Sequence, residues 1–127
     1  MRVKLHVLLD AEEHIDLTVN GIKKDNDYKY MENGISVSIK IKNNILYITR
    51  KTKEYNIELE LDKNKITTSY YSVFGGTKKF ALNTKVKKLK YNDSMIEVVY
   101  NLEGNDFKYK LEVISWKKSY KNKLKKP

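Results

Sequence analysis

The sequence contains no cysteine, which excludes disulfide bonds, thiolate catalysis and zinc sites with cysteine ligands. It also lacks any apolar run approaching the roughly 20 residues that a membrane helix needs. The N-terminus lacks the continuous apolar stretch of a signal peptide. Arginine is scarce, since Arg2 and Arg50 are the only two among 26 basic residues. These absences predict a soluble, cytoplasmic protein that has no association with a membrane.

The formal net charge of +10 is the feature that suggests an acidic or nucleic-acid partner. Six lysines and no acidic residue lie in residues 117–127, so this segment contributes +6 and residues 1–116 only +4. A protein that binds phosphates or bases specifically is expected to use arginine where bidentate geometry matters. The abundance of Lys, Asn, Ile and Tyr, which all have A/T-rich codons, favours the base composition of the genome as the explanation.

Apolar and polar residues alternate with a period of two from Arg2 to Trp116, and no amphipathic helix interrupts them. In the first hairpin, we expect Leu9 to lie opposite Ile15 and Leu5 opposite Val19. The pattern predicts about ten strands, at residues 3–9, 15–19, 28–31, 35–41, 45–51, 55–62, 66–71, 79–91, 96–102 and 107–113.

Local irregularities in this pattern predict turns and one bulge. Asn20-Gly21 has the composition of a turn, and Gly75-Gly76 ends another strand. Phe80 and Val86 share one face of the longest strand, but the apolar residues after Lys87-Lys88 are out of phase with them. One extra residue near Lys87-Lys88, as in a β-bulge, would restore the phase.

Each predicted strand has one apolar face, which must be buried although no helix is available to cover it. The two solutions are a sandwich of two sheets and a sheet closed on itself. Short turns between successive strands favour an all-β, antiparallel up-and-down β-barrel of about 8–10 strands, because closure also removes exposed edges. We expect one barrel domain at residues 1–116 and a Lys-rich, flexible C-terminal tail at residues 117–127.

Catalytic and metal-binding patterns are weak. His6 and His14 are expected on the outer face of the first hairpin, with Asp16 diagonal to His6, and no spacing supplies a third metal ligand. Glu12-Glu13 are adjacent in a turn and diverge, so they do not form a general acid and base pair. We therefore expect neither an enzyme nor a bound metal or cofactor.

Several polar residues share phase with the apolar faces of their strands. Arg50 is in phase with Leu46 and Ile48 and is expected near the mouth of the barrel, where a guanidinium needs an anion or several acceptors. Either these groups bind an amphipathic ligand, or the tyrosines lie at wet rims and Arg50 pairs with a local carboxylate. The expected inward polar residues, besides Arg50, are Thr68, Tyr70, Thr84, Tyr100 and Tyr109.

Arg50, Tyr70 followed by Ser72-Val73-Phe74-Gly75, and Thr84 resemble positions of the YwiB-like family, small bacterial proteins of unknown function. The family has Thr, Pro and Tyr where this chain has Ser72, Val73 and Phe74, and a glycine where Lys51-Thr52 stand. The resemblance implies a calycin- or lipocalin-like β-barrel and a bacterial source. It does not imply a reaction.

These observations together favour a non-enzymatic barrel that binds a small, partly apolar ligand at or inside one mouth. The alternative is a nucleic-acid or acidic-partner binder that uses the tail and the lysines at positions 78, 79, 85, 87 and 88. The sequence does not predict an oligomeric state. The candidate ligand-binding residues are Arg50, Tyr70, Phe74, Gly75, Thr84 and Tyr100.

Overall fold

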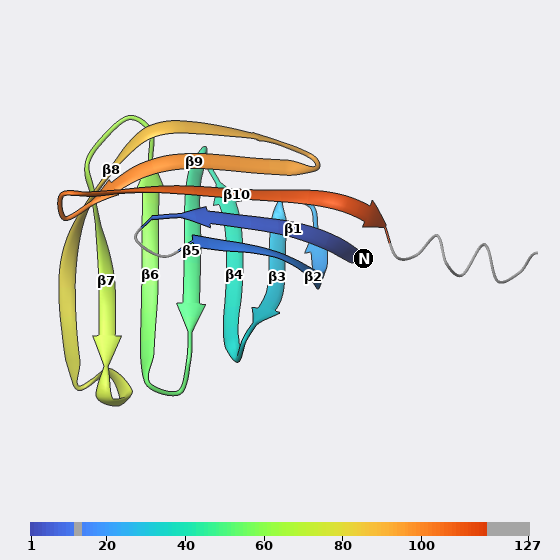
Figure 1. Ribbon diagram of the computed structural model, residues 1–127. Helices are drawn as coiled ribbons and strands as arrows, with labels where there is room; N and C mark the ends of the chain where they lie inside the picture. The colour runs from blue at the N-terminus through green and yellow to red at the C-terminus, as the bar shows by residue number, and fades with distance from the viewer. Residues whose placement is uncertain (12–13, 117–127) are drawn as a thin grey trace, which may run out of the picture.

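A closed barrel of ten antiparallel strands forms the computed structural model, which describes residues 1–11 and 14–116 (Figure 1). Each strand pairs with the next along the chain, and β10 pairs with β1 to complete the barrel. The predicted antiparallel barrel is thus confirmed, and the tail of residues 117–127 lies outside the described residues. The elements are β1 (Arg2–Asp10), β2 (His14–Lys24), β3 (Asp27–Glu32), β4 (Ile35–Lys42), β5 (Ile45–Lys51), β6 (Tyr55–Asp62), β7 (Thr67–Val73), the 3-10 turn η1 (Phe74–Gly76), β8 (Lys78–Asn92), β9 (Met95–Leu102) and β10 (Asn105–Trp116).

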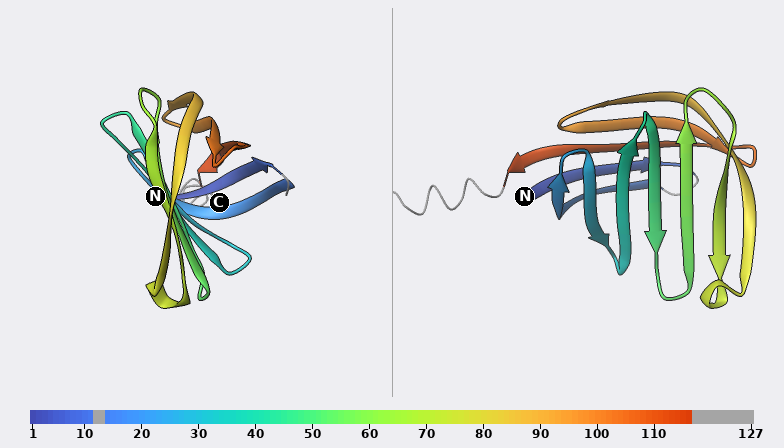
Figure 2. Two further views of the ribbon diagram at one scale, coloured as in Figure 1. Left: turned by 90° about the vertical axis from the view of Figure 1, so that its left-hand side faces the viewer. Right: turned by 180° about the vertical axis from the view of Figure 1, so that it is seen from behind.

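The barrel is flattened into two groups of strands that cross each other. Strands β3 to β7 stand upright in Figure 1, and β1, β2, β9 and β10 run across them. The 15-residue strand β8 belongs to both groups, because its first half pairs with β7 and its second half with β9. Figure 2 shows the same crossing from the side and from behind. Alternate residues of both groups therefore face a shared interior.

The predicted irregularities account for how the strands bend. The first hairpin has the expected register, with Leu9 opposite Ile15 and Leu5 opposite Val19. The pairing of β8 with β9 shifts between Val86 and Lys88, which confirms the predicted bulge. A second shift, between Lys4 and Leu5 in the pairing of β1 with β10, was not predicted.

The predicted turn at Asn20-Gly21 is wrong, because β2 continues through both residues to Lys24. At Gly21 the strand still pairs with β1 and begins to pair with β3. A Cβ atom at Gly21 would lie 2.7 Å from Leu5 Cδ1 and 2.8 Å from the backbone oxygen of Lys29. The glycine is therefore present because two neighbouring strands approach closely, and the local turn preference of Asn-Gly is overridden.

The predicted phase of β7 is also wrong. Ser69 and Thr67 are buried, whereas Thr68 is exposed and the side chain of Tyr70 is 37% exposed on the outer face. Backbone pairing between β6 and β7 stops at the Glu58–Tyr70 pair. Beyond that pair, hydrogen bonds made by side-chain hydroxyl groups replace the backbone hydrogen bonds between the two strands. Ser69 Oγ accepts the backbone N–H of Glu60 at 3.0 Å, and Thr67 donates to the Glu60 carbonyl.

The barrel interior is filled mainly by aliphatic side chains from both groups of strands. The largest of the fully buried residues include Leu5, Ile39, Leu46, Ile96 and Leu111. Burying a side chain of this size stabilises the fold by roughly 1.5–3 kcal/mol. Polar side chains also reach the interior. The hydroxyl group of Thr84 donates to Ser69 Oγ at 2.7 Å, and further polar groups lie near one end of the barrel.

Candidate functional site

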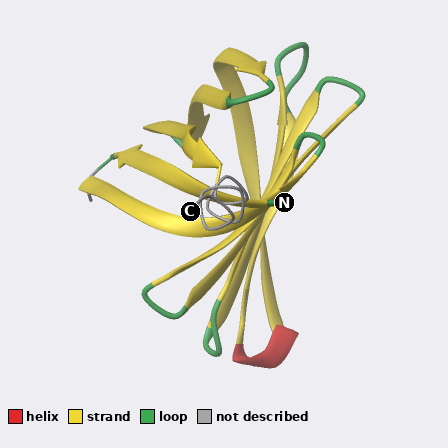
Figure 3. Cartoon of the chain, turned by 90° about the vertical axis from the view of Figure 1, so that its right-hand side faces the viewer, coloured by secondary structure: helices red, strands yellow, loops and turns green. Residues whose placement is uncertain are grey.

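One end of the barrel gathers three chain connections, namely β3 to β4, β5 to β6, and β7 to β8 through η1. These connections lie together at the bottom of Figure 1, and η1 is the red segment at the bottom of Figure 3. Just inside this end, a row of mutually paired residues crosses five strands, and strand alternation places all of them on the inner face. The row consists of Val37, Arg50, Ile57, Tyr71 and Phe80. We call this end the mouth.

An ion pair lies at the base of the mouth. Arg50 Nη2 donates to Glu32 Oε2 at 2.6 Å, and Nη1 lies 3.5 Å from Oε1. The side chain of Glu32 is 3% exposed and that of Arg50 is 14% exposed. Burial alone would lower the pKa of Arg50, but the hydrogen bond and charge of Glu32 outweigh it and raise this pKa. Of the two sequence-based alternatives for Arg50, the structure therefore contains the local carboxylate.

Three tyrosines lie close enough to Arg50 for its charge to lower their pKa values. The hydroxyl groups of Tyr30 and Tyr109 are 2.7 Å apart and share a hydrogen bond in the interior. Tyr100 stacks on Phe107 with ring centroids 5.3 Å apart. Burial raises the pKa of Tyr30 and of Tyr100 to about 12, although the charge of Arg50 lowers both. Burial also raises the pKa of Tyr109 well above its ordinary value. These hydroxyl groups stay protonated in the folded protein and can donate hydrogen bonds.

An alkaline titration should distinguish three buried tyrosines from the tyrosines that are exposed to solvent. Tyr28, Tyr30 and Tyr100 have pKa values raised by burial from 10.0 to about 12, whereas tyrosines of the unfolded chain ionise near 10. We therefore expect these three tyrosines to make a contribution to stability that is fully present below pH 10 and is lost as the pH rises from 10 towards 12. Phenolate absorbance should show these three ionising only as the chain unfolds. Their complete ionisation near pH 10, with the fold intact by circular dichroism, would contradict this arrangement.

A wall of aromatic rings rises from the ion pair to the rim. Tyr55 and Tyr71 stack with centroids 5.8 Å apart, and Tyr71 contacts Phe80 at 6.2 Å. These residues belong to β6, β7 and β8 and face inward. Phe80 is nevertheless 49% exposed, and Tyr55 and Tyr71 are half-buried. Rings that face inward and remain accessible to solvent can contact a ligand.

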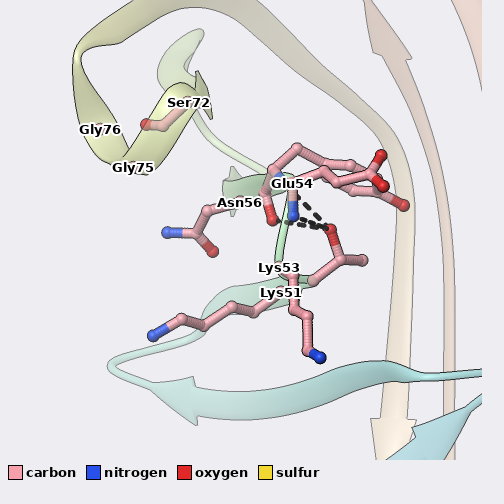
Figure 4. A pocket seen from close by; sticks show the side chains of 9 residues that line it. Lys51, Lys53, Glu54, Asn56, Ser72, Gly75 and Gly76 are labelled. Atoms are coloured by element: carbon pink, nitrogen blue, oxygen red, sulfur yellow. Dashed lines mark hydrogen bonds between the residues drawn. The ribbon is translucent and has the colours of Figure 1, made fainter.

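A second feature lies at the same end, on the outer face. A pocket of about 510 Å³ lies beneath η1 and beside the β5–β6 connection. Figure 4 shows Asn56 between the segment of Lys51 and Lys53 and the loop of Ser72, Gly75 and Gly76. The remaining lining residues are Thr52, Glu54 and Tyr55. Thr52 Oγ1 accepts the backbone N–H groups of Glu54 and Tyr55 at 3.0 Å, which fixes the shape of this connection.

The structure brings together only part of the predicted site. Arg50 lies at the base of the mouth, close enough to Tyr100 for its charge to lower the pKa of that tyrosine, whereas Gly75 lines the pocket beneath η1. Thr84 is deep in the interior, where it bonds to Ser69. Tyr70 faces outward, with Lys79 Nζ 4.3 Å from its ring centroid. The side chain of Phe74 lies outside the part of the chain that the structure describes.

Sequence reasoning missed Glu32, the partner of Arg50. The pattern of β3 contained the necessary information, because Tyr28, Tyr30 and Glu32 are two residues apart and all three are buried. Asn56, which lines the outer pocket, was not among the predicted site residues either. It lies opposite Lys51 on one side and Ser72 on the other.

The histidines behave as predicted for the outer face. His6 Nε2 lies 2.6 Å from the carboxylate of Asp16, its diagonal neighbour, and His14 lies 3.7 Å from Asp10. Within residues 1–11 and 14–116, no three His, Asp or Glu side chains are placed to hold a metal ion together. In the same residues no helix has the length and apolar character needed to cross a membrane.

Comparisons with known proteins give one family and one solved structure. No curated protein matches the sequence. The crystal structure of the ywiB protein from Bacillus subtilis aligns with a TM-score of 0.43 and 11% sequence identity, covering 88% of this chain and 89% of that chain. The model of a family described as a domain of unknown function, DUF1934, matches residues 7–113. The predicted resemblance to a family of unknown function is confirmed, and the chain belongs to the DUF1934 family.

Proposed function

We propose that this protein is a non-enzymatic binder that holds a small, partly apolar molecule with an anionic group in the mouth of the barrel. The observation that carries the proposal is the combination of the accessible rings of Tyr55, Tyr71 and Phe80 with a partly accessible guanidinium below them. Rings can bind the apolar part of a ligand, and a guanidinium can bind its anionic group.

Arg50 retains donors for such a group although it is paired. A guanidinium has five N–H donors, and Glu32 accepts two of them. Among the described residues no other acceptor is bonded to Arg50, and 14% of its side chain is exposed. Glu32 offsets the cost of placing the charge here, so the remaining donors are held ready for a ligand oxygen atom.

The proposal is tested with the fluorescent probe 1-anilinonaphthalene-8-sulfonate, which combines aromatic rings with an anionic group. We expect saturable binding to the folded protein. Phe80→Ala should weaken it by about fivefold to tenfold, because a ring contact is worth about 1 kcal/mol. Tyr70→Ala is the matched control, because Tyr70 precedes Tyr71 on β7 but faces outward. Equal effects of the two substitutions, or no binding by the native protein, would refute a site in the mouth.

The alternative nucleic-acid or acidic-partner function has less support from the described residues. Of the lysines proposed for it, Lys87 pairs with Asp106 at 2.9 Å and Lys88 with Glu97 at 3.4 Å. Lys79 lies over the ring of Tyr70. These contacts neutralise or engage much of the positive charge on the outer face of β8. The six lysines of residues 117–127 lie outside the described residues.

A further inference from the structure

The ion pair at the base of the mouth has no net charge. Arg50 carries the positive charge and Glu32 the negative one, and Arg50 Nη2 lies 2.6 Å from Glu32 Oε2. Among the described residues, neither side chain is paired with a third charged group. Because Glu32 is buried, water screens its charge poorly. A ligand that binds to Arg50 therefore meets a fixed negative charge close to the guanidinium.

The tyrosine hydroxyl groups around Arg50 add donors but no positive charge. Those of Tyr30 and Tyr109 share one hydrogen bond. Burial raises the pKa of Tyr30 and of Tyr100 to about 12 and that of Tyr109 well above 10, so all three are neutral near pH 7. Nothing in this group of tyrosines can compensate for a second negative charge on a ligand.

The number of charges on a ligand decides whether the base of the mouth attracts it. Arg50 can offset one negative charge, whereas a second one has no cation to pair with and is repelled by Glu32. The cost of desolvating an ion also rises with the square of its charge, which disfavours a dianion further. Lys78 is in phase with Phe80 at the rim, but it is exposed, so water and salt screen its charge.

The wall of rings favours a flat group as the apolar part of the ligand. The ring planes of Tyr55 and Tyr71 are inclined by 27°, and those of Tyr71 and Phe80 by 34°. An aromatic ring can extend such a wall through offset or tilted contacts, which stabilise a pair of rings beyond the area that they bury. Phe80 is 49% exposed, which leaves part of its ring surface available for this contact.

We propose that the mouth selects aromatic monoanions, such as an aryl carboxylate or an aryl sulfate, over phosphate monoesters that carry two negative charges. Arg50 binds the anionic group, the carboxylate of Glu32 repels a second charge, and the rings of Tyr71 and Phe80 contact the aromatic part. This inference rests on the binding function proposed for the mouth, and it adds that Glu32 determines which charge the ligand carries.

The test compares 2-naphthyl sulfate with 2-naphthyl phosphate, which share a ring system and a tetrahedral anionic group. At pH 8 the sulfate carries one negative charge and the phosphate two, because the second pKa of a phosphate monoester is about 6. Binding to the full chain is followed through the fluorescence of the naphthyl group. We expect the sulfate to bind at least about tenfold more tightly than the phosphate. Phe80→Ala should weaken both by the same factor, because both place their rings in the mouth.

Glu32→Gln tests whether this carboxylate is the cause of the preference. Glutamine has nearly the same shape and keeps an acceptor for Arg50, but it removes the negative charge. We expect the ratio of the two affinities to fall to about one or to invert in favour of the phosphate. Glu58→Gln is the matched control, because Glu58 is an exposed carboxylate on the outer face of β6 and its loss should leave the ratio unchanged.

The outcomes separate this inference from the function on which it rests. If neither naphthyl ester nor 1-anilinonaphthalene-8-sulfonate binds, the proposed function of the mouth is wrong. If both esters bind, with equal affinity or with the phosphate preferred, the mouth is a binding site but does not select monoanions. A preference for the sulfate that persists in Glu32→Gln would overturn the role of Glu32. If that variant does not fold, the comparison in the native protein still decides whether monoanions are selected.

Discussion

Replacing Arg50 with methionine is expected to lower the free energy of unfolding by about 3–5 kcal/mol. The substitution leaves the carboxylate of Glu32, which is 3% exposed, without the two hydrogen bonds that it accepts from Arg50. Removing one partner of a buried pair is costly because the other charge stays desolvated. Urea denaturation should show a lower midpoint with an unchanged slope.

The control is the double substitution Arg50→Met/Glu32→Met, which removes both charges at once. Buried ion pairs are often replaced by apolar side chains without loss of stability, so the double variant should recover most of the native free energy of unfolding. If the single variant is as stable as the native protein, the pair is not desolvated as the structure indicates. If the double variant is less stable than the single one, the charges themselves stabilise the fold.

Replacing Gly21 with alanine is expected to destabilise the barrel by about 3 kcal/mol, the upper end of the usual cost of overpacking. The new methyl group would lie 2.7 Å from Leu5 Cδ1 and 2.8 Å from the backbone oxygen of Lys29. The side chain of Leu5 is fully buried and Lys29 lies on the paired strand β3, so neither atom moves freely. Thermal unfolding of the two proteins measures the effect.

Gly34→Ala provides the comparison. Gly34 has a φ of +82° and no atom within 4 Å of an added Cβ, so alanine there costs only backbone strain of about 1–2 kcal/mol. Gly21 has no such φ, and without a steric clash alanine would stabilise the chain by restricting its unfolded state. A Gly21→Ala variant as stable as the native protein would therefore show that β1, β2 and β3 do not approach so closely.

Much of the architecture could be predicted because a half-buried strand imposes its period directly on the sequence. The β5 and β6 segments and the hairpin of β1 with β2 follow strict alternation, and the structure confirms them. The bulge near Lys87 was predictable for the same reason, because the change in phase of the apolar residues is visible within the sequence of β8 itself. Closure into a barrel followed from the lack of any other cover for ten apolar faces.

The errors arose where contacts between distant segments decide the outcome. Asn20-Gly21 is a strong local turn pattern, but the close approach of β1 and β3 decides the role of the glycine. In β7 the expected phase placed Thr68 and Tyr70 on the inner face. The inner positions instead hold small hydroxyl residues that bond to the backbone of Glu60 where the ladder ends.

The candidate site was less predictable than the fold. The phase of Arg50 could be read from β5, but its partner Glu32 lies across an intervening strand, so the pair depends on the registers of β3, β4 and β5 together. This pairing leaves no periodic trace in the sequence.

The pairing of β1 with β10 affects how the chain is made. Leu5 in β1 pairs with Val113 in β10. During synthesis, the edge of β1 that pairs with β10 therefore stays unpaired until almost the whole domain has left the ribosome. An unpaired edge of this kind attracts other strands, including those of neighbouring nascent chains. Because the closing contact joins such distant segments, folding is expected to be slow, and the growing chain would benefit from a chaperone until β10 arrives.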